Sequence, residues 1–147
     1  MTTPDSAVDA LQTCLAAEHA AVYGYGVLGG ALATTGAGTE SADYARADAS
    51  YTVHRGRRDH LAKMLRNAGK SPVPAEAAYD IPFPATDKSS SRRLARHLER
   101  RCAGVYARAV ASTVDDTRRF VANALTDAAV RDMKWGGKPQ AFPGLQR

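Results

Sequence analysis

The chain has 147 residues, with 20 Lys and Arg against 15 Asp and Glu, a formal net charge of +5. Hydrophobic residues make up 44% and charged residues 24%, which is ordinary for a soluble globular protein of one domain. The longest apolar run, residues 20–33, is too short to cross a bilayer, and the N-terminus shows no secretory signal. We therefore expect a cytoplasmic protein without a membrane segment.

The first predicted helix covers about residues 4–34 and carries a carboxylate where a core residue is expected. Pro4 suits its first turn, and the glycines of 36–38 end it. Glu18 falls on a stripe with alternating spacing of three and four, which is typical of the buried face of a helix in a bundle. A buried carboxylate needs a partner, a metal or a raised pKa, so the group that contacts Glu18 decides the nature of the site. The stripe consists of Val8, Leu11, Leu15, Glu18, Val22, Tyr25, Gly29 and Leu32.

Three further helices are predicted at about 42–68, 88–113 and 116–135 from the same spacing, followed by an irregular tail at 136–147. The second and third are separated by a long segment, 70–86, and the other connections are short. Short connections join antiparallel neighbours. The sequence thus predicts an all-α four-helix bundle, in which two antiparallel helix pairs are joined by a long Pro-rich crossover.

Segment 70–86 is the expected crossover because its four prolines exclude a helix through most of it. About 17 extended residues can reach roughly 50 Å, more than the roughly 38 Å of a 25-residue helix. The segment can therefore return along the whole bundle. Ile81 and Phe83, which lie between prolines, favour a packed crossover over a disordered hinge.

Charged residues fall on or beside the inner face of every predicted helix. The formal charges of two carboxylates and two guanidinium groups would cancel. The guanidinium group of an arginine can also donate a pair of hydrogen bonds to a carboxylate. Tyr25, Tyr51 and Tyr106 could add hydroxyls. The spacing leaves open which of two adjacent arginines on the second helix faces the core, and a register error would let some charges reach solvent. The predicted buried charge network consists of Glu18, Arg57, Arg58, Glu99, Arg131 and His54.

Four stretches of the chain resemble an uncharacterised family of ferritin-like domains. They read LAAEHAAVYGYG at 15–26, HRGRRD at 54–59, AYDIPFP at 78–84 and LTDAAVR at 125–131. The similarity extends over about residues 7–135. This resemblance implies a ferritin-like four-helix bundle, but the family is a domain of unknown function, so it implies no reaction.

The di-metal pattern of ferritin-like proteins requires a Glu from one helix of each pair and a Glu-x-x-His motif from the other. Glu18 and Glu99 could fill the two single-Glu positions. The second helix, however, has arginine where the bridging glutamate belongs, and the fourth has Arg131 on its inner face and no histidine. Because guanidinium groups do not ligate cations, we predict a non-catalytic ferritin-like domain without a cofactor, whose di-metal site is replaced by salt bridges.

A residual metal-binding or di-iron-type redox protein is the first alternative. Its site would combine Glu18 and Glu99 with His60, or with His54, around Fe or Mn. No Glu and His spaced three apart on one helix survive to support it.

The second alternative is nucleic-acid binding, as in ferritin-like proteins that protect DNA. Arg92, Arg96 and Arg100 make a basic stripe at four-residue spacing on the third predicted helix. No known nucleic-acid-binding motif accompanies the stripe, so it can also be a solvated face.

Partners are only broadly constrained by the sequence. A homodimer is the default expectation for a small helical protein, and Trp135, Phe142 and Leu145 could pack on the bundle or on a second copy. No protein partner can be named from these residues.

Overall fold

The structure, a computed structural model, describes residues 4–145, and within this range it is all-α with no strand. Four helices form the bundle that the sequence predicts, and a single turn of 3₁₀ helix (η1, Gly38–Glu40) lies in the first connection. Residues 136–145 form an irregular tail, and the last two residues of the predicted tail lie outside the described range. The helices are α1 (Pro4–Ala33), α2 (Ala42–Asn67), α3 (Lys88–Ser112) and α4 (Asp115–Lys134).

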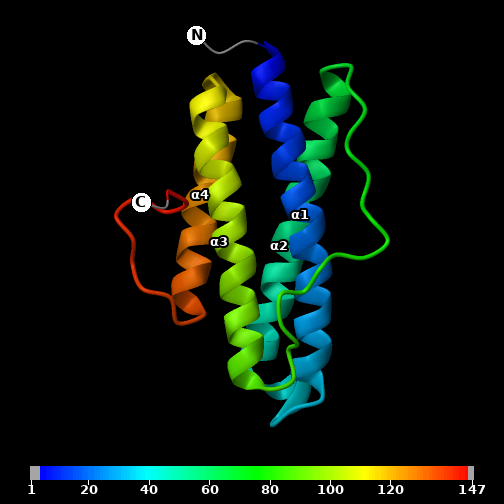
Figure 1. The fold of residues 1–147 in the computed structure, drawn as a ribbon, viewed down its shortest axis with the longest axis vertical. Helices are drawn as coiled ribbons and strands as arrows, with labels where there is room; N and C mark the ends of the chain where they lie inside the picture. The colour runs from blue at the N-terminus through cyan, green and yellow to red at the C-terminus, as the bar shows by residue number, and fades with distance from the viewer. Residues whose placement is uncertain (1–3, 146–147) are drawn as a thin grey trace.

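Neighbouring helices of the bundle run antiparallel. Figure 1 shows α1 descending, α2 rising, the crossover returning along the bundle, α3 rising and α4 descending. α1 packs closely against both α2 and α3, and α3 packs against α4. The fourth side, between α2 and α4, is held by long polar side chains, which belong to the site described below.

Local capping explains the two ends of α2 and the start of α3. The Ser41 side chain accepts a hydrogen bond from the third residue of α2 at 3.0 Å. Asp87 and Ser90 form a reciprocal capping box at the start of α3. Gly69, with a φ of 72°, follows α2 in a left-handed conformation that glycine adopts without strain.

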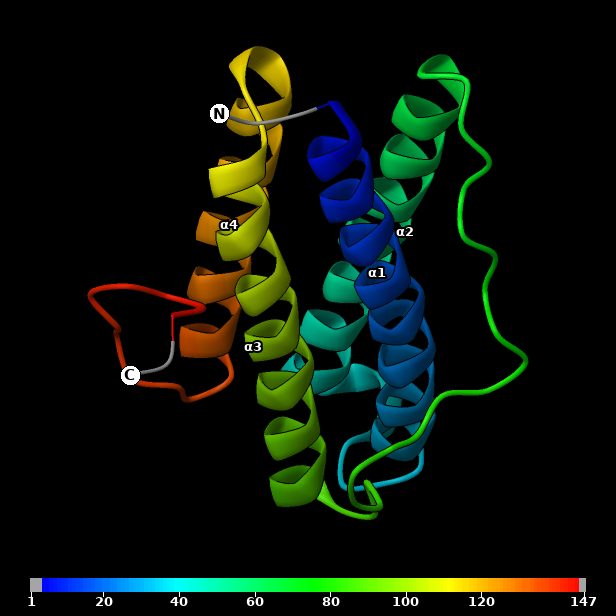
Figure 2. The same ribbon diagram turned by 45° about the horizontal axis from the view of Figure 1, so that its top comes forward.

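The crossover packs on the bundle near both of its ends. The Gln12 side chain accepts a hydrogen bond from the backbone N–H of Val73 at 2.8 Å, and the Nε2 atom of His19 lies 3.0 Å from the Val73 carbonyl oxygen. Ile81 and Phe83 pack against the core. Figures 1 and 2 show the crossover lying beside α1 and α2 before it enters α3. The predicted packed crossover is therefore confirmed.

Two apolar clusters fill the interior. One surrounds Leu15, Leu61 and Val121, and the other surrounds Leu28 and Leu94. The fully buried polar residues of α2 and α3 described next lie between these clusters along the chain, so the polar centre sits at mid-bundle.

Candidate functional site

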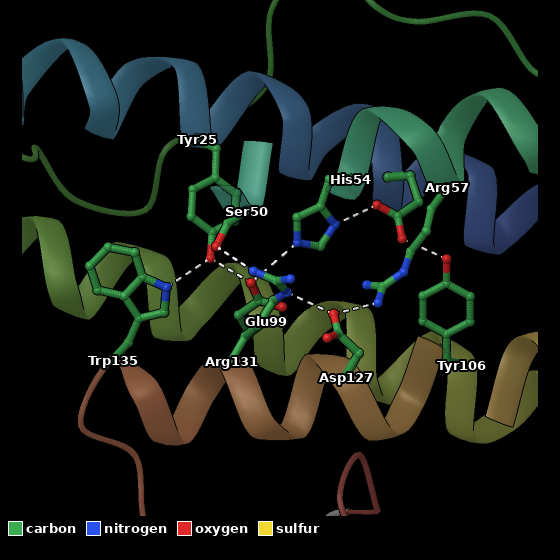
Figure 3. A network of polar contacts seen from close by, with 10 residues as sticks. Tyr25, Ser50, His54, Arg57, Glu99, Tyr106, Asp127, Arg131 and Trp135 are labelled. Atoms are coloured by element: carbon green, nitrogen blue, oxygen red, sulfur yellow. Dashed lines mark hydrogen bonds and ion pairs between the residues drawn. The ribbon is translucent and has the colours of Figure 1, made fainter. Parts of the chain in front are cut away.

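Three side chains from three helices meet in the middle of the bundle. Glu18 comes from α1, His54 from α2 and Glu99 from α3, and all three are 0% exposed. The Nδ1 atom of His54 lies 2.5 Å from Glu18 Oε2, and its Nε2 atom lies 3.2 Å from Glu99 Oε1. The imidazole ring therefore bridges the two carboxylates, as its place beside Glu99 in Figure 3 illustrates.

Tyrosine hydroxyls complete the contacts of both carboxylates. Tyr106 donates a hydrogen bond to Glu18 Oε1, and Tyr25 donates one to Glu99 Oε1, each at 2.5 Å. Trp135 Nε1 in turn donates to the Tyr25 hydroxyl at 3.1 Å (Figure 3). Both oxygens of Glu18 thus accept hydrogen bonds, whereas Glu99 Oε2 is buried without a hydrogen-bond partner among the described residues.

The surroundings of His54 favour its doubly protonated form. Both ring nitrogens face carboxylate oxygens, and both can donate only when the ring is an imidazolium. Burial alone would lower the pKa of His54, but the charge of Glu18 and the ring's hydrogen bonds raise it well above its ordinary value. Burial and the neighbouring carboxylates also raise the pKa values of Tyr25 and Tyr106, so both remain neutral donors.

The arginines of the centre pair with an aspartate that the sequence analysis did not select. Arg57 Nη2 lies 2.5 Å from Asp127 Oδ2, and Arg131 Nε lies 2.7 Å from the same oxygen. Arg131 also donates to Ser50 Oγ at 3.1 Å. These contacts join α2 to α4 (Figure 3). Arg57 also interacts electrostatically with Glu18. Burial would lower the pKa of Arg57, but the charge of Glu18 raises it.

The position of Arg58 corrects the expected network. The guanidinium of Arg58 binds Asp59 at 2.8 Å, and it forms no hydrogen bond or ion pair with Glu18, Glu99 or Asp127, so it takes no part in the centre. Neither glutamate accepts a hydrogen bond from an arginine among the described residues; histidine and tyrosines take that place. The reason is rotational: neighbouring helix residues lie about 100° apart, so Arg57 faces inward and Arg58 does not.

His60 also lies away from the centre. Its side chain is exposed, and the centre of its ring lies 4.6 Å from that of Phe120, with the two ring planes tilted by 43°. The alternative ligand set with His60 is therefore not assembled, and His54 is the imidazole that joins Glu18 and Glu99.

Sequence reasoning missed two members of the site, Asp127 and Ser50. Asp127 carried a usable signal, because it precedes Arg131 by four residues on one helix, the spacing of a helical ion pair. Ser50 precedes His54 by four residues on α2, but a serine on an inner face carries no comparable signal.

The donor atoms of the centre do not fit a di-metal site. Two metals require carboxylates and imidazoles from all four helices. Here α4 supplies Arg131 and an aspartate that is already paired with two arginines. Glu18, His54 and Cys102 do bring one ligand-type atom each within 4.8 Å of one another. Burial, and secondarily the charge of Glu18, raise the pKa of Cys102 to about 11, so the thiol holds its proton.

Comparisons with known proteins place the chain in a family. Residues 10–147 match the model of a domain of unknown function, DUF4439, and the chain belongs to this family. It is similar to a conserved hypothetical protein, rv2844, from Mycobacterium tuberculosis, whose crystal structure superimposes with a TM-score of 0.80 at 30% sequence identity. That match covers 92% of this chain and 98% of the other. No curated protein matches. None of the described helices is long and apolar enough to span a membrane.

Proposed function

We propose that the chain is a non-catalytic, ferritin-like bundle that works through its surface, and that a hydrogen-bonded polar centre takes the place of a di-metal site. The observation that carries this proposal is the position of His54. Both ring nitrogens are engaged by carboxylates, at 2.5 Å from Glu18 and 3.2 Å from Glu99. A ring nitrogen that donates a hydrogen bond has no lone pair to offer a metal.

Charge balance supports the same proposal. With His54 protonated, three cationic groups face three carboxylates across the bundle, so the centre needs no metal to neutralise its acids. A buried charge without a partner destabilises a fold by several kcal/mol, which explains why these residues are arranged together. The balanced set is Glu18, Glu99, Asp127, His54, Arg57 and Arg131.

The test is metal retention. The purified chain is reconstituted anaerobically with Fe(II), Mn(II) or Zn(II), desalted and subjected to elemental analysis, with Glu18→Gln as the matched variant. We expect no retained metal in either protein, and the same melting temperature with and without EDTA. Two metals per parent chain, lost in Glu18→Gln, would overturn the proposal and favour a di-metal oxidase.

A single metal ion is the second candidate, favoured by the cluster of Glu18, His54 and Cys102. The unpartnered Oε2 atom of Glu99 would add a fourth ligand, an oxygen of the carboxylate whose other oxygen lies 3.2 Å from His54 Nε2. Imidazole and thiolate ligands suit Zn or Fe. One retained metal per chain that disappears in Cys102→Ser, but not in the control Cys14→Ser, would support this candidate.

The nucleic-acid alternative is weakened by the ion pairs on α3. Arg92 binds Asp43 at 2.8 Å, and Arg96 and Arg100 lie 3.2 Å and 3.3 Å from the carboxylate oxygens of Asp132. Each arginine of the stripe thus contacts an aspartate of the chain, and Arg96 and Arg100 share one, so fewer of the stripe's charges remain for phosphates.

A further inference from the structure

A wide groove lies between α3, α4 and the irregular tail, and we call it the tail groove. It encloses about 1420 Å³. Pockets for small molecules are typically about 300–1,000 Å³. Figure 1 shows the tail leaving α4 and turning back beside it. Residues 138–145 of the tail line one side of the groove. These dimensions suit a polypeptide segment better than a small ligand.

Exposed apolar side chains concentrate in the tail groove. Six large hydrophobic residues are exposed in the described part of the chain, and four of them line this groove. Phe142 and Leu145, at 63% and 60% exposed, are the most exposed of the six. Exposed apolar side chains gathered in one groove and bordered by polar ones are typical of a binding surface. The four are Val130, Met133, Phe142 and Leu145.

Cations without an acidic partner line the same groove. Arg101, Arg108 and Lys138 are exposed there, and none of them forms an ion pair with another described residue. Arg96 and Arg100, by contrast, share Asp132. The groove therefore offers positive charge to a partner that brings carboxylates.

The tail is seated firmly enough to keep these residues in place. Gly144 has a φ of 78° and lies so close to α3 that a Cβ atom there would overlap the carbonyl oxygen of Ala103. At the other end, the backbone N–H of Gly137 donates to the carbonyl of Asp132 at 2.8 Å. A groove formed before binding loses less conformational entropy when a partner docks.

We propose that the tail groove binds an acidic amphipathic segment of another protein. This inference rests on the proposed function, in which the chain works through its surface. The apolar residues decide the class of partner: a nucleic acid would use Arg101 and Arg108 but leave the aliphatic side chains in water. A peptide with acidic and apolar residues satisfies both sets at once.

The experiment is selection from a library of random displayed peptides of about 16 residues, long enough for four turns of helix. The intact chain, the groove variant Arg101→Glu/Arg108→Glu and the control Arg66→Glu/Arg118→Glu are compared. The control reverses two exposed arginines outside the groove. We expect the parent and the control to enrich peptides that combine Asp or Glu with Leu, Ile or Phe.

Affinity of an enriched peptide, followed by fluorescence anisotropy, gives the quantitative test. We expect the groove variant to bind about tenfold or more weakly than the parent, and the charge control to bind like the parent. A second pair of variants tests the apolar residues of the groove. Met133→Ser/Phe142→Ser should weaken binding, whereas the control Val114→Ser should not. Circular dichroism confirms that each variant is folded.

Three outcomes of the binding experiments would overturn the inference. They are no enrichment, equal affinity for the groove and control variants, or tighter groove-dependent binding of a short DNA duplex than of any peptide. Groove-dependent self-association in sedimentation would instead assign the surface to a second copy and would equally overturn it. The metal-retention experiment depends only on residues of the polar centre. A failure of the proposed function can therefore be distinguished from a failure of this inference.

Discussion

The polar centre and the tail groove both combine charged and apolar side chains, yet the charged groups are paired in the centre and only partly paired in the groove. In the centre, His54 contacts Glu18 and Glu99 within the fold. In the groove, Arg101 and Arg108 are exposed and without ion-pair partners among the described residues. An unpartnered buried charge costs several kcal/mol, whereas an exposed one stays hydrated. The centre therefore holds the helices together, and the groove remains open to a partner.

Removing His54 should break the centre most severely. His54→Leu leaves Glu18 and Glu99 buried without their shared donor, so we expect a loss of about 3–5 kcal/mol in the free energy of unfolding. Urea denaturation measures it. His60→Leu, an exposed histidine on the same helix, should change stability by less than about 0.5 kcal/mol. Equal effects of the two substitutions would contradict the buried network.

The two glutamates should respond unequally to loss of charge. Both oxygens of Glu18 accept hydrogen bonds, so Glu18→Gln turns one acceptor into a donor that faces Tyr106 or His54. We expect this to cost about 1.5–3 kcal/mol. Glu99→Gln can place its amide nitrogen at the unpartnered Oε2 position and should cost roughly half as much. Denaturant titrations that give the reverse order would be incompatible with the geometry.

The partly exposed ion pairs between α2 and α4 should contribute less. Asp127→Asn weakens the contacts with Arg57 and Arg131, and because the Asp127 side chain is 36% exposed we expect a loss of about 1 kcal/mol. Asp59→Asn, which alters a surface pair of α2, is the matched control. A loss equal to that of His54→Leu would show that these ion pairs are as buried as the contacts of His54, contrary to the 36% exposure of Asp127.

The pH dependence of Asp127 has a defined sign. Burial would raise the pKa of this carboxyl, but hydrogen bonds and charges from Arg131 and Arg57 together lower it below its ordinary value of 3.8. The unfolded chain thus takes up the proton first as pH falls. The stability difference between parent and Asp127→Asn should be complete above pH 3.8 and shrink as pH falls through the folded-state pKa. A difference that grows on acidification would contradict the assignment.

Arg58→Ala should have the smallest effect, because its guanidinium binds Asp59 at the surface of α2. We expect a change below about 0.5 kcal/mol in urea denaturation. Arg57→Ala, one residue earlier, removes a partner of Asp127 that is only 11% exposed and should cost more. A larger loss of stability for Arg58→Ala than for Arg57→Ala would indicate that Arg58, and not Arg57, faces the core.

Much of the fold could be predicted because its signals are local. Pro72 and Pro74 mark the crossover, and Gly69 marks the end of the helix before it. The burial of Glu18 follows from its place in the stripe of α1. Its partner could not be predicted, because helix rotation decides whether Arg57, Arg58 or His54 faces α1.

The tail groove lay beyond sequence reasoning for a different reason. Phe142 and Leu145 occur in an irregular segment without periodicity, so no pattern predicts which side they face. Arg101 and Arg108 lie seven residues apart on α3, outside the stripe of Arg92, Arg96 and Arg100 that attracted attention. In the structure every arginine of this stripe contacts an aspartate, whereas Arg101 and Arg108 form no ion pair with another described residue.

The most direct test of the central claim is the protonation of the His54 ring. A long-range ¹H–¹⁵N correlation spectrum of histidine-labelled protein near neutral pH, with His54→Gln used for assignment, reads both nitrogens separately. The account predicts that Nδ1 and Nε2 each carry a proton, shared with Glu18 and Glu99. A ring nitrogen without a proton, as in a neutral imidazole or a metal ligand, would contradict it.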